Sequence, residues 1–155
     1  MKYLFYYGTP VGKIGIAERD GAVTDVFFGS ESAPADAEIK ETPLLKETYK
    51  QLKEYFDGKR KIFDIPLNLE GTAFQKRDWQ ELLKIPYGET RSYGEIAKAI
   101  GTPKGARAVG LANNRNPVSI IVPCHRVIGA DGKLVGYGGG LPIKEALLKL
   151  EKAIL

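Results

Sequence analysis

The sequence predicts a two-part α/β (α+β) protein, in which a small β-sheet domain with one helix precedes a mainly helical domain. Short aromatic and β-branched segments separated by glycine-containing turns fill the first third of the chain, as in β-strands. Apolar residues at three- and four-residue spacing dominate later segments, as in amphipathic helices. We expect one domain over residues 1–70 and a second over residues 71–155. A linker at about residues 67–73 would join the two.

The predicted strands of the first domain cover residues 4–7, 13–18 and 22–28. The Asp20-Gly21 pair between the last two favours a hairpin. A helix is predicted over residues 43–56, because leucines and aromatic residues recur there at helical spacing before Asp57-Gly58. Residues 62–67 are compatible with one more strand.

In the second domain, helices are predicted over residues 74–83, from Ser92 to 100, over 103–113 and from about 142 onward. Ser92 and Glu95 have the spacing of a capping box, and Pro103 has the position of a first helical residue. The second and third of these helices, joined by a short turn with Gly101, suggest a helix-turn-helix. The apolar run 118–122 is interpreted as a buried strand or extended segment.

Composition restricts the class of protein. The 155 residues carry a formal net charge of +4, which permits a polyanionic partner without requiring one. One cysteine excludes an internal disulfide, and one cysteine with one histidine excludes a zinc cluster of such ligands, so we expect no metal and no cofactor. Because we see neither a membrane span nor a secretory signal, we expect a cytosolic protein.

The single cysteine and the single histidine are adjacent, as Cys124 and His125. A lone cysteine is often a buried structural residue. A nearby base or cation, such as His125 or Arg126, would instead lower its pKa and make it a nucleophile. Glu151, at the edge of the apolar stripe of the last helix, is a candidate to orient His125, although such a glutamate is usually exposed.

The helix predicted over 103–113 has a face of small residues that would allow a close approach to a DNA groove. We expect this exposed face to contain Ala106, Gly110 and Asn113, and the inward face to contain Ala108, Leu111 and Ala112. Arg107 flanks the small face, although it could equally be a solvated surface arginine. The glycine cluster 138–140 does not have the spacing of a phosphate-binding loop.

Residues 116–128, which include Pro-Cys-His-Arg-Val, resemble the active-site signature of the O6-alkylguanine-DNA alkyltransferases. Other segments resemble that family in the same order: Gly71-Thr72, Phe74-Gln75, Trp79, 85–90, Ser92-Tyr93, 106–110, Tyr137, 139–141, Lys144-Glu145, 147–148 and Glu151. The match is dense from Gly71 to Glu151. The N-terminal third resembles the family only in size and strand pattern.

The resemblance implies a ribonuclease H-like N-terminal domain and a C-terminal domain that contains the active site. It further implies a DNA repair protein that flips O6-alkylguanine, and O4-alkylthymine as a second candidate substrate, out of the duplex. The alkyl group would pass irreversibly to Cys124, once per molecule. The expected partner is double-stranded DNA bound through its minor groove by a monomer, in the cytoplasm or in a eukaryotic nucleus.

The resemblance also implies roles for individual residues. Cys124 corresponds to the alkyl acceptor, and His125 to the base that acts through a water and is oriented by Glu151. Asn116 corresponds to an asparagine that structures the turn before the acceptor. Tyr93 corresponds to a tyrosine that rotates the nucleotide, and we expect its hydroxyl to donate to the leaving guanine.

The remaining roles concern the DNA and the base. Arg107 corresponds to an arginine that fills the base stack, and further DNA contacts are expected from Ala106, Gly110, Asn113 and Arg126. Val127 and Tyr137 correspond to residues at the guanine pocket. Gly138 stands where some relatives have a polar residue, so we expect a roomier pocket.

Three other classes of protein remain as alternatives. Alkyltransferase-like proteins bind lesions without catalysis, but they replace the cysteine that is present here. A cysteine hydrolase would draw its cysteine and histidine from distant positions rather than adjacent ones. A helix-turn-helix regulator would not need the Pro-Cys-His-Arg segment.

Overall fold

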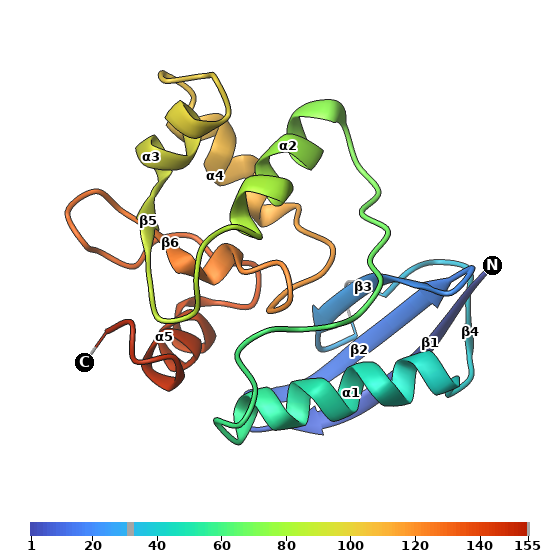
Figure 1. The fold of residues 1–155 in the computed structure, drawn as a ribbon. Coiled ribbons are helices and arrows are strands. Elements are labelled where there is room, and N and C mark those ends of the chain that lie inside the picture. The colour runs from blue at the N-terminus through green and yellow to red at the C-terminus, as the bar shows by residue number, and fades with distance from the viewer. Residues whose placement is uncertain (31–32, 155) are drawn as a thin grey trace. The chain divides into compact units, whose positions relative to one another are not determined.

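The structure is a computed structural model that describes residues 1–30 and 33–154 (Figure 1). The chain divides into two compact units, Met1–Glu70 and Gly71–Leu155. Strands and one helix build the first unit, and helices dominate the second. This order of elements confirms the predicted mixed α/β class.

The first unit contains a four-stranded sheet in the order β3-β2-β1-β4. Its strands are β1 (Lys2–Thr9), β2 (Gly12–Arg19), β3 (Ala22–Phe28) and β4 (Ala37–Ile39). The first three are the predicted strands and pair antiparallel, whereas the unpredicted β4 is three residues long and pairs parallel to β1. Residues 62–67 do not form the additional strand that the sequence allowed, because only a single bridge joins Leu67 to Val23.

Helix α1 (Pro43–Phe56) packs against the sheet and has the predicted bounds. The hydroxyl of Thr42 accepts a hydrogen bond from the Leu45 amide, which satisfies one of the free donors at the helix start. Its buried face includes Leu45, Leu52 and Tyr55, all without solvent exposure. The apolar spacing that predicts this helix therefore also predicts its buried face.

The second unit consists of helices and one two-stranded parallel sheet. Its elements are α2 (Ala73–Leu82), β5 (Arg91–Ser92), α3 (Tyr93–Ala99), α4 (Ala106–Asn114), the 3-10 helix η1 (Cys124–Arg126), β6 (Val127–Ile128) and α5 (Leu141–Leu150). Strands β5 and β6 pair with each other. Helices α2, α3 and α4 pack together, and η1 lies against α2 and α5.

Helices α3 and α4 form the helix-turn-helix. The predicted capping box is present at α3, since the Ser92 hydroxyl accepts from the Glu95 amide and the Glu95 carboxylate accepts from the Ser92 amide. Helix α4 begins at Ala106 rather than at Pro103. The reason is a tight turn, in which the Gly105 amide donates to the Thr102 carbonyl at 2.7 Å before the helix starts.

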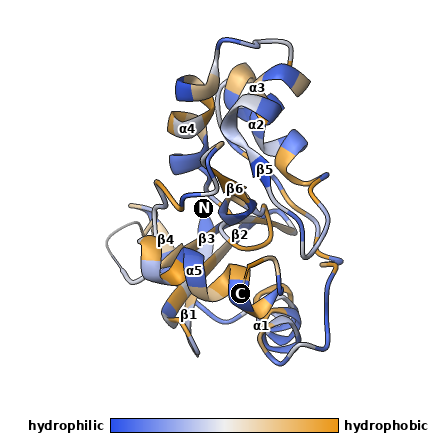
Figure 2. Cartoon of the chain, turned by 90° about the vertical axis from the view of Figure 1, so that its left-hand side faces the viewer, coloured by the Kyte–Doolittle hydropathy of each residue, from blue (hydrophilic) through white to orange (hydrophobic). Residues whose placement is uncertain are grey.

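The predicted buried face of α4 is wrong in two of its three residues. Ala112 is buried as predicted, but Ala108 is exposed and Leu111 is 64% exposed, whereas Val109 and Asn113 are buried. Most residues of α4, which Figure 2 colours by hydropathy, are apolar or small, so the apolar pattern alone leaves the rotation of the helix ambiguous. The face is set by a polar contact instead, because the Asn113 amide meets the buried carboxylate of Asp78 in α2.

The four apolar residues of 118–122 are buried, but the segment does not form a strand. Their backbone is folded into turns, in which the Val122 amide donates to the Val118 carbonyl and Ile120 has a positive φ of 71°. These turns connect the end of α4 to Pro123 and η1. Across residues 1–30 and 33–154, no helix combines the length and the apolar character that crossing a membrane requires.

Candidate active site

Cys124 is held by the side chain of Asn116. Cys124 is the first residue of η1 and is 6% exposed. The Asn116 amide nitrogen donates to Cys124 Sγ at 3.3 Å and to the Val122 carbonyl at 2.8 Å, and its oxygen accepts from the Val118 amide at 3.0 Å. One asparagine therefore fixes both the buried turn and the sulfur at its end.

Cys124 is a neutral thiol in this environment. Burial raises the pKa of Cys124 to about 11, although the hydrogen bond from Asn116 and the charge of Lys144 act in the opposite direction. His125 and Arg126 do not lower this pKa, because both side chains are turned to Glu151. A reaction at this sulfur must therefore include removal of its proton.

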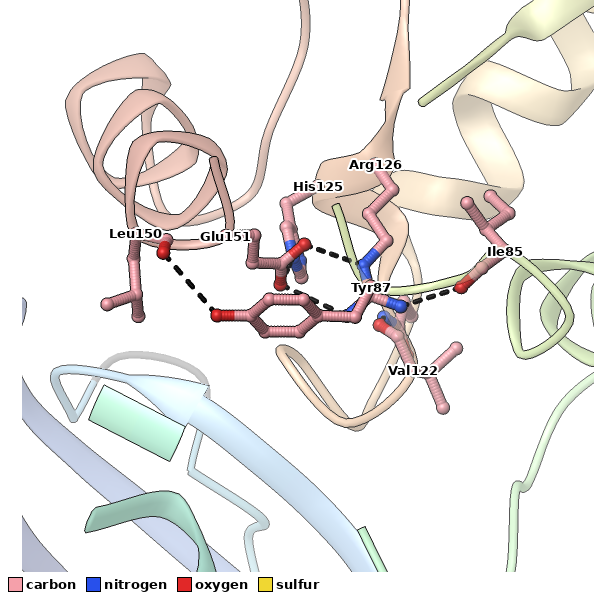
Figure 3. Close-up of polar contacts among 8 residues, drawn as sticks. Ile85, Tyr87, Val122, His125, Arg126, Leu150 and Glu151 are labelled. Atoms are coloured by element: carbon pink, nitrogen blue, oxygen red, sulfur yellow. Dashed lines mark hydrogen bonds and ion pairs between the residues drawn. The ribbon is translucent and has the colours of Figure 1, made fainter. Parts of the chain in front are cut away.

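Glu151 lies between His125 and Arg126 (Figure 3). Its Oε2 is 2.7 Å from His125 Nε2, and its Oε1 accepts from Arg126 Nε at 2.8 Å. Glu151 follows α5 directly, and both it and His125 are almost fully buried. Burial alone would raise the pKa of Glu151, but the hydrogen bonds from His125 and Arg126 outweigh burial and lower it to about 2.

The ionised Glu151 fixes the proton of His125. A carboxylate can only accept, so His125 Nε2 carries the proton and donates it to Glu151, which leaves Nδ1 with a lone pair. Nδ1 is buried and has no hydrogen-bond partner among the described residues. Burial also lowers the pKa of His125, so the ring is neutral and Nδ1 is available as a base.

A buried lysine, Lys144 of α5, organises the other side of the site. Its Nζ donates to the carbonyls of Val127 at 2.6 Å, Val135 at 2.8 Å and Gly136 at 3.2 Å. The Tyr93 hydroxyl donates to the same Val135 carbonyl at 2.8 Å. Lys144 thus connects β6 to the loop that follows it and lies beside the hydroxyl of Tyr93.

Tyr93 and Tyr137 both interact electrostatically with Cys124. Burial is the main cause that raises the pKa of Tyr93 to about 12, so its hydroxyl keeps its proton and remains a donor. Gly138 is exposed, and a Cβ added there would meet nothing within 4 Å. A larger side chain would therefore fit at this position, which leaves open space where glycine stands.

The structure separates the predicted DNA-binding residues into two groups. Arg107 is exposed on α4, and Ala106 and Gly110 are partly exposed on the same helix. Asn113 and Arg126 are buried and engaged inside the unit, Asn113 with Asp78 and Arg126 with Glu151 and the Ile85 carbonyl. Those two predictions are wrong, because neither side chain faces outward.

The sequence analysis did not identify two buried charged residues of the second unit, Lys144 and Asp78. Lys144 has no exposure although it lies in an amphipathic helix, and Asp78 has none although it directly follows the exposed Lys76 and Arg77 of α2. Asp78 stands between Phe74 and Leu82 at four-residue spacing, which places it on the inward stripe of α2. That spacing is the signal that would have identified it.

Taken together, these features define a helix-turn-helix protein that carries a buried cysteine beside a histidine–glutamate pair. A family model of the 6-O-methylguanine DNA methyltransferase DNA-binding domain matches residues 73–153, and one of the ribonuclease-like domain of the same proteins matches residues 2–69. The chain belongs to the 6-O-methylguanine DNA methyltransferase family.

Individual relatives agree with this assignment. The chain is 53% identical over 152 residues to a methylated-DNA–protein-cysteine methyltransferase of Methanosarcina acetivorans, covering 96% of this chain and 97% of the relative. It is 67% identical over 147 residues to a protein of the same name from Mycobacterium bovis, covering 94% and 89%. A crystal structure of Mycobacterium tuberculosis OGT in complex with DNA superposes with a TM-score of 0.92 at 48% identity, covering 97% and 93%.

Proposed function

We propose that this protein repairs double-stranded DNA by transferring the alkyl group of O6-alkylguanine to Sγ of Cys124. The family assignment supports a DNA-binding methyltransferase whose acceptor is a cysteine of the protein, and Cys124 is the only cysteine of the chain. The observation that carries the proposal is the placement of this thiol. Asn116 holds its sulfur, and His125 beside it has a free basic nitrogen.

The reaction begins with removal of the thiol proton. His125 Nδ1 takes this proton through one intervening water, and the imidazolium that forms is stabilised by the carboxylate of Glu151. Sγ then forms a bond to the alkyl carbon while the bond from that carbon to guanine O6 breaks. The electron pair of the broken bond stays on guanine, where the Tyr93 hydroxyl donates a hydrogen bond or its proton.

The product is a thioether at Cys124 and unmodified guanine in DNA. A thioether is stable, and no second cysteine exists in the chain to displace the alkyl group. Each molecule therefore reacts once. The reduced thiol that this chemistry needs fits the cytoplasm, or the nucleus in a eukaryote.

The base must leave the helix to reach a buried sulfur. In this proposal Arg107 enters the space left in the stack, and the small residues Ala106 and Gly110 face the minor groove; the exposure of Arg107 and the partial exposure of Ala106 and Gly110 on α4 support this. Val127 and Tyr137 would border the flipped guanine, and the space at Gly138 would tolerate larger alkyl groups. We propose a monomer as the active form and O4-alkylthymine as a second candidate substrate.

A single mass measurement tests the transfer. The protein is incubated with duplex DNA that contains O6-methylguanine, and the mass of the peptide containing Cys124 is measured by mass spectrometry. We expect a gain of one methyl group, at most one per protein molecule, and none in Cys124→Ala. Repeated turnover, or no gain with wild-type protein that binds the DNA, would refute the transferase and favour a lesion-binding protein without catalysis.

A further inference from the structure

Helix α4 exposes a large apolar side chain, Leu111, on its outer face. Leu111 is 64% exposed, whereas Val109 and Ala112 on the opposite face are buried. Because successive residues of a helix are turned by about 100°, Leu111 shares its face with Arg107 and Asn114. Both of these residues are exposed as well. The leucine therefore lies near the centre of the outer face of α4, not at its edge.

The outer face of α4 is also basic. Arg107 near the start of the helix and Arg115 at its end are exposed, and no residue of α4 is acidic. Within residues 1–30 and 33–154, neither guanidinium has a carboxylate at ion-pair distance. Each arginine is about 6 Å from Leu111 along the helix axis. This face therefore combines an apolar centre with an unpaired cation on each side.

The minor groove of DNA offers surfaces that match this combination. Phosphates line its two rims, and the deoxyribose carbons of its walls are apolar. Proteins that bind there use arginine together with apolar side chains such as leucine. A protein partner matches this face less well, because the cores of protein interfaces are depleted in charged residues. Charge complementarity therefore favours DNA as the partner of this face.

The position of Leu111 in the helix-turn-helix supports the same partner. Exposure alone would not identify a contact, because single exposed apolar residues are common on protein surfaces. However, α4 lies within the match to the family model of the DNA-binding domain, which covers residues 73–153. Gly110 faces Tyr93, since a Cβ added there would lie 3.7 Å from the tyrosine ring. The next residue, Leu111, is turned by about 100° from that direction, so it would meet the duplex beside the nucleotide that Tyr93 rotates.

We propose that Leu111 is a DNA-contact residue, whose side chain enters the minor groove and packs against its deoxyribose walls while Arg115 contacts a phosphate at the rim. This inference rests on the proposed function, which supplies the DNA, and adds the residues that hold the duplex next to the flipped base. The contact of Leu111 is apolar, so its contribution to affinity does not depend on salt. The contact of Arg115 releases counterions, so its contribution does.

Binding of a short undamaged duplex, measured by fluorescence anisotropy between about 50 and 200 mM salt, separates the two contributions. Leu111→Ala should weaken binding by about 10-fold at every salt concentration and leave the slope of log K against log salt unchanged. Arg115→Gln should reduce the slope by about 0.9, which is the value of one phosphate contact. Unchanged affinity in Leu111→Ala would overturn the contact, and a reduced slope in this variant would show that the leucine acts through phosphates instead.

Two further variants show whether the effect belongs to an apolar side chain at this position. Leu111→Met keeps an apolar side chain of similar volume, so it should bind within about 3-fold of wild type. Leu83→Ala is the matched control, because it removes another exposed leucine at the end of α2 and should bind as wild type does. Equal weakening in Leu83→Ala and Leu111→Ala would refute a contact specific to α4.

Two measurements without DNA exclude other roles for Leu111. Leu111→Ala should melt at the wild-type temperature by Trp79 fluorescence, because the side chain is exposed. A melting temperature lowered by several degrees would assign the leucine a structural role. Sedimentation velocity should show the same monomer for both proteins, and self-association of wild type that is lost in Leu111→Ala would assign the leucine to a protein interface.

The binding assay contains no alkylated base, so its outcome is separate from that of the transfer assay. Wild-type protein that binds the duplex through Leu111 but takes no methyl group from DNA would refute the proposed function and leave this contact standing. Wild-type protein that accepts the methyl group while Leu111→Ala binds unchanged would refute the contact and leave the proposed function standing.

Discussion

Replacement of Glu151 by glutamine would remove one buried negative charge while preserving the shape of the side chain. In the native protein this carboxylate accepts hydrogen bonds from Nε2 of His125 at 2.7 Å and from two nitrogens of Arg126 at 2.8 and 3.1 Å. The variant leaves the buried guanidinium of Arg126 without a counter-charge. It also removes the anion that would stabilise protonated His125 during reaction.

The pKa of Glu151 gives the magnitude of the expected loss in unfolding free energy. Its fall from 4.5 to about 2 in the folded protein corresponds to about 3 kcal/mol of unfolding free energy at pH 7. The folded pKa is lower than the unfolded one, so this contribution is complete above 4.5 and is lost as the pH falls towards 2. At pH 3 about 1 kcal/mol remains.

Urea unfolding of wild type and Glu151→Gln, followed by fluorescence of the single tryptophan, measures this difference. Trp79 is buried in the second unit, so it reports on the unit that contains Glu151. We expect a loss of about 3 kcal/mol at pH 7 that shrinks by more than half at pH 3. The rate of methyl transfer should fall by about 10²-fold or more, because the imidazolium loses its partner.

Two outcomes would refute this reasoning. A stability loss of less than about 1 kcal/mol at pH 7 would show that the carboxylate does not compensate Arg126. An equal loss at pH 7 and pH 3 would show that the effect comes from packing rather than charge. The double variant with Arg126→Met is the control, since removal of both charges should restore part of the lost stability.

Three further predictions concern the site and the DNA. Lys144→Met should lower the unfolding free energy by about 2 kcal/mol or more and slow transfer from the free base, because the Val127 carbonyl loses its donor; unchanged single-turnover kinetics would contradict this. Arg107→Ala should slow repair of duplex DNA far more than reaction with the free alkylated base, and equal slowing would argue against its insertion into the stack. DNA affinity measured by fluorescence anisotropy should fall as salt rises, since phosphate contacts release counterions, and a flat response would contradict contacts of that kind.

The fold class and the family could be predicted from the sequence because both depend on local patterns. Helix α1 has the predicted bounds, since its apolar spacing, the Thr42 cap and the Asp57-Gly58 end are all short-range signals. Helix α3 begins as the Ser92 capping box predicts. The inward direction of Glu151 was allowed by its place at the edge of the stripe of α5, although the pattern alone favoured exposure.

The errors have a common physical origin, which is that distant partners decide the burial of polar groups. Lys144 and Asp78 look like solvated charges until their acceptors and donors, which come from other elements, are in place. Asn113 turned inward, and Leu111 outward, for the same reason. Arg126 was expected at the DNA because the sequence could not show that Glu151 would hold it.

Residues 118–122 illustrate a different limit. Their apolar character correctly indicates burial, but a short apolar run does not distinguish a strand from a buried turn. The Asn116 side chain, which donates to the Val122 carbonyl, supplies the hydrogen bond that a neighbouring strand would otherwise provide. The roles assigned to individual residues in base flipping and proton transfer stay predictions.

The side-chain amide of Asn116 donates both to Cys124 Sγ and to the Val122 carbonyl. A chemical change at the sulfur therefore affects the same group that holds the backbone of the buried turn. A thiol sulfur accepts from this amide within a site that leaves Cys124 only 6% exposed. An added alkyl group must be accommodated at a sulfur that Asn116 already holds, and overpacking a buried site typically costs about 1–3 kcal/mol. The reacted protein should therefore differ from the fresh one in shape as well as in mass. Another protein could then recognise the reacted form by its altered surface, without direct contact with Cys124.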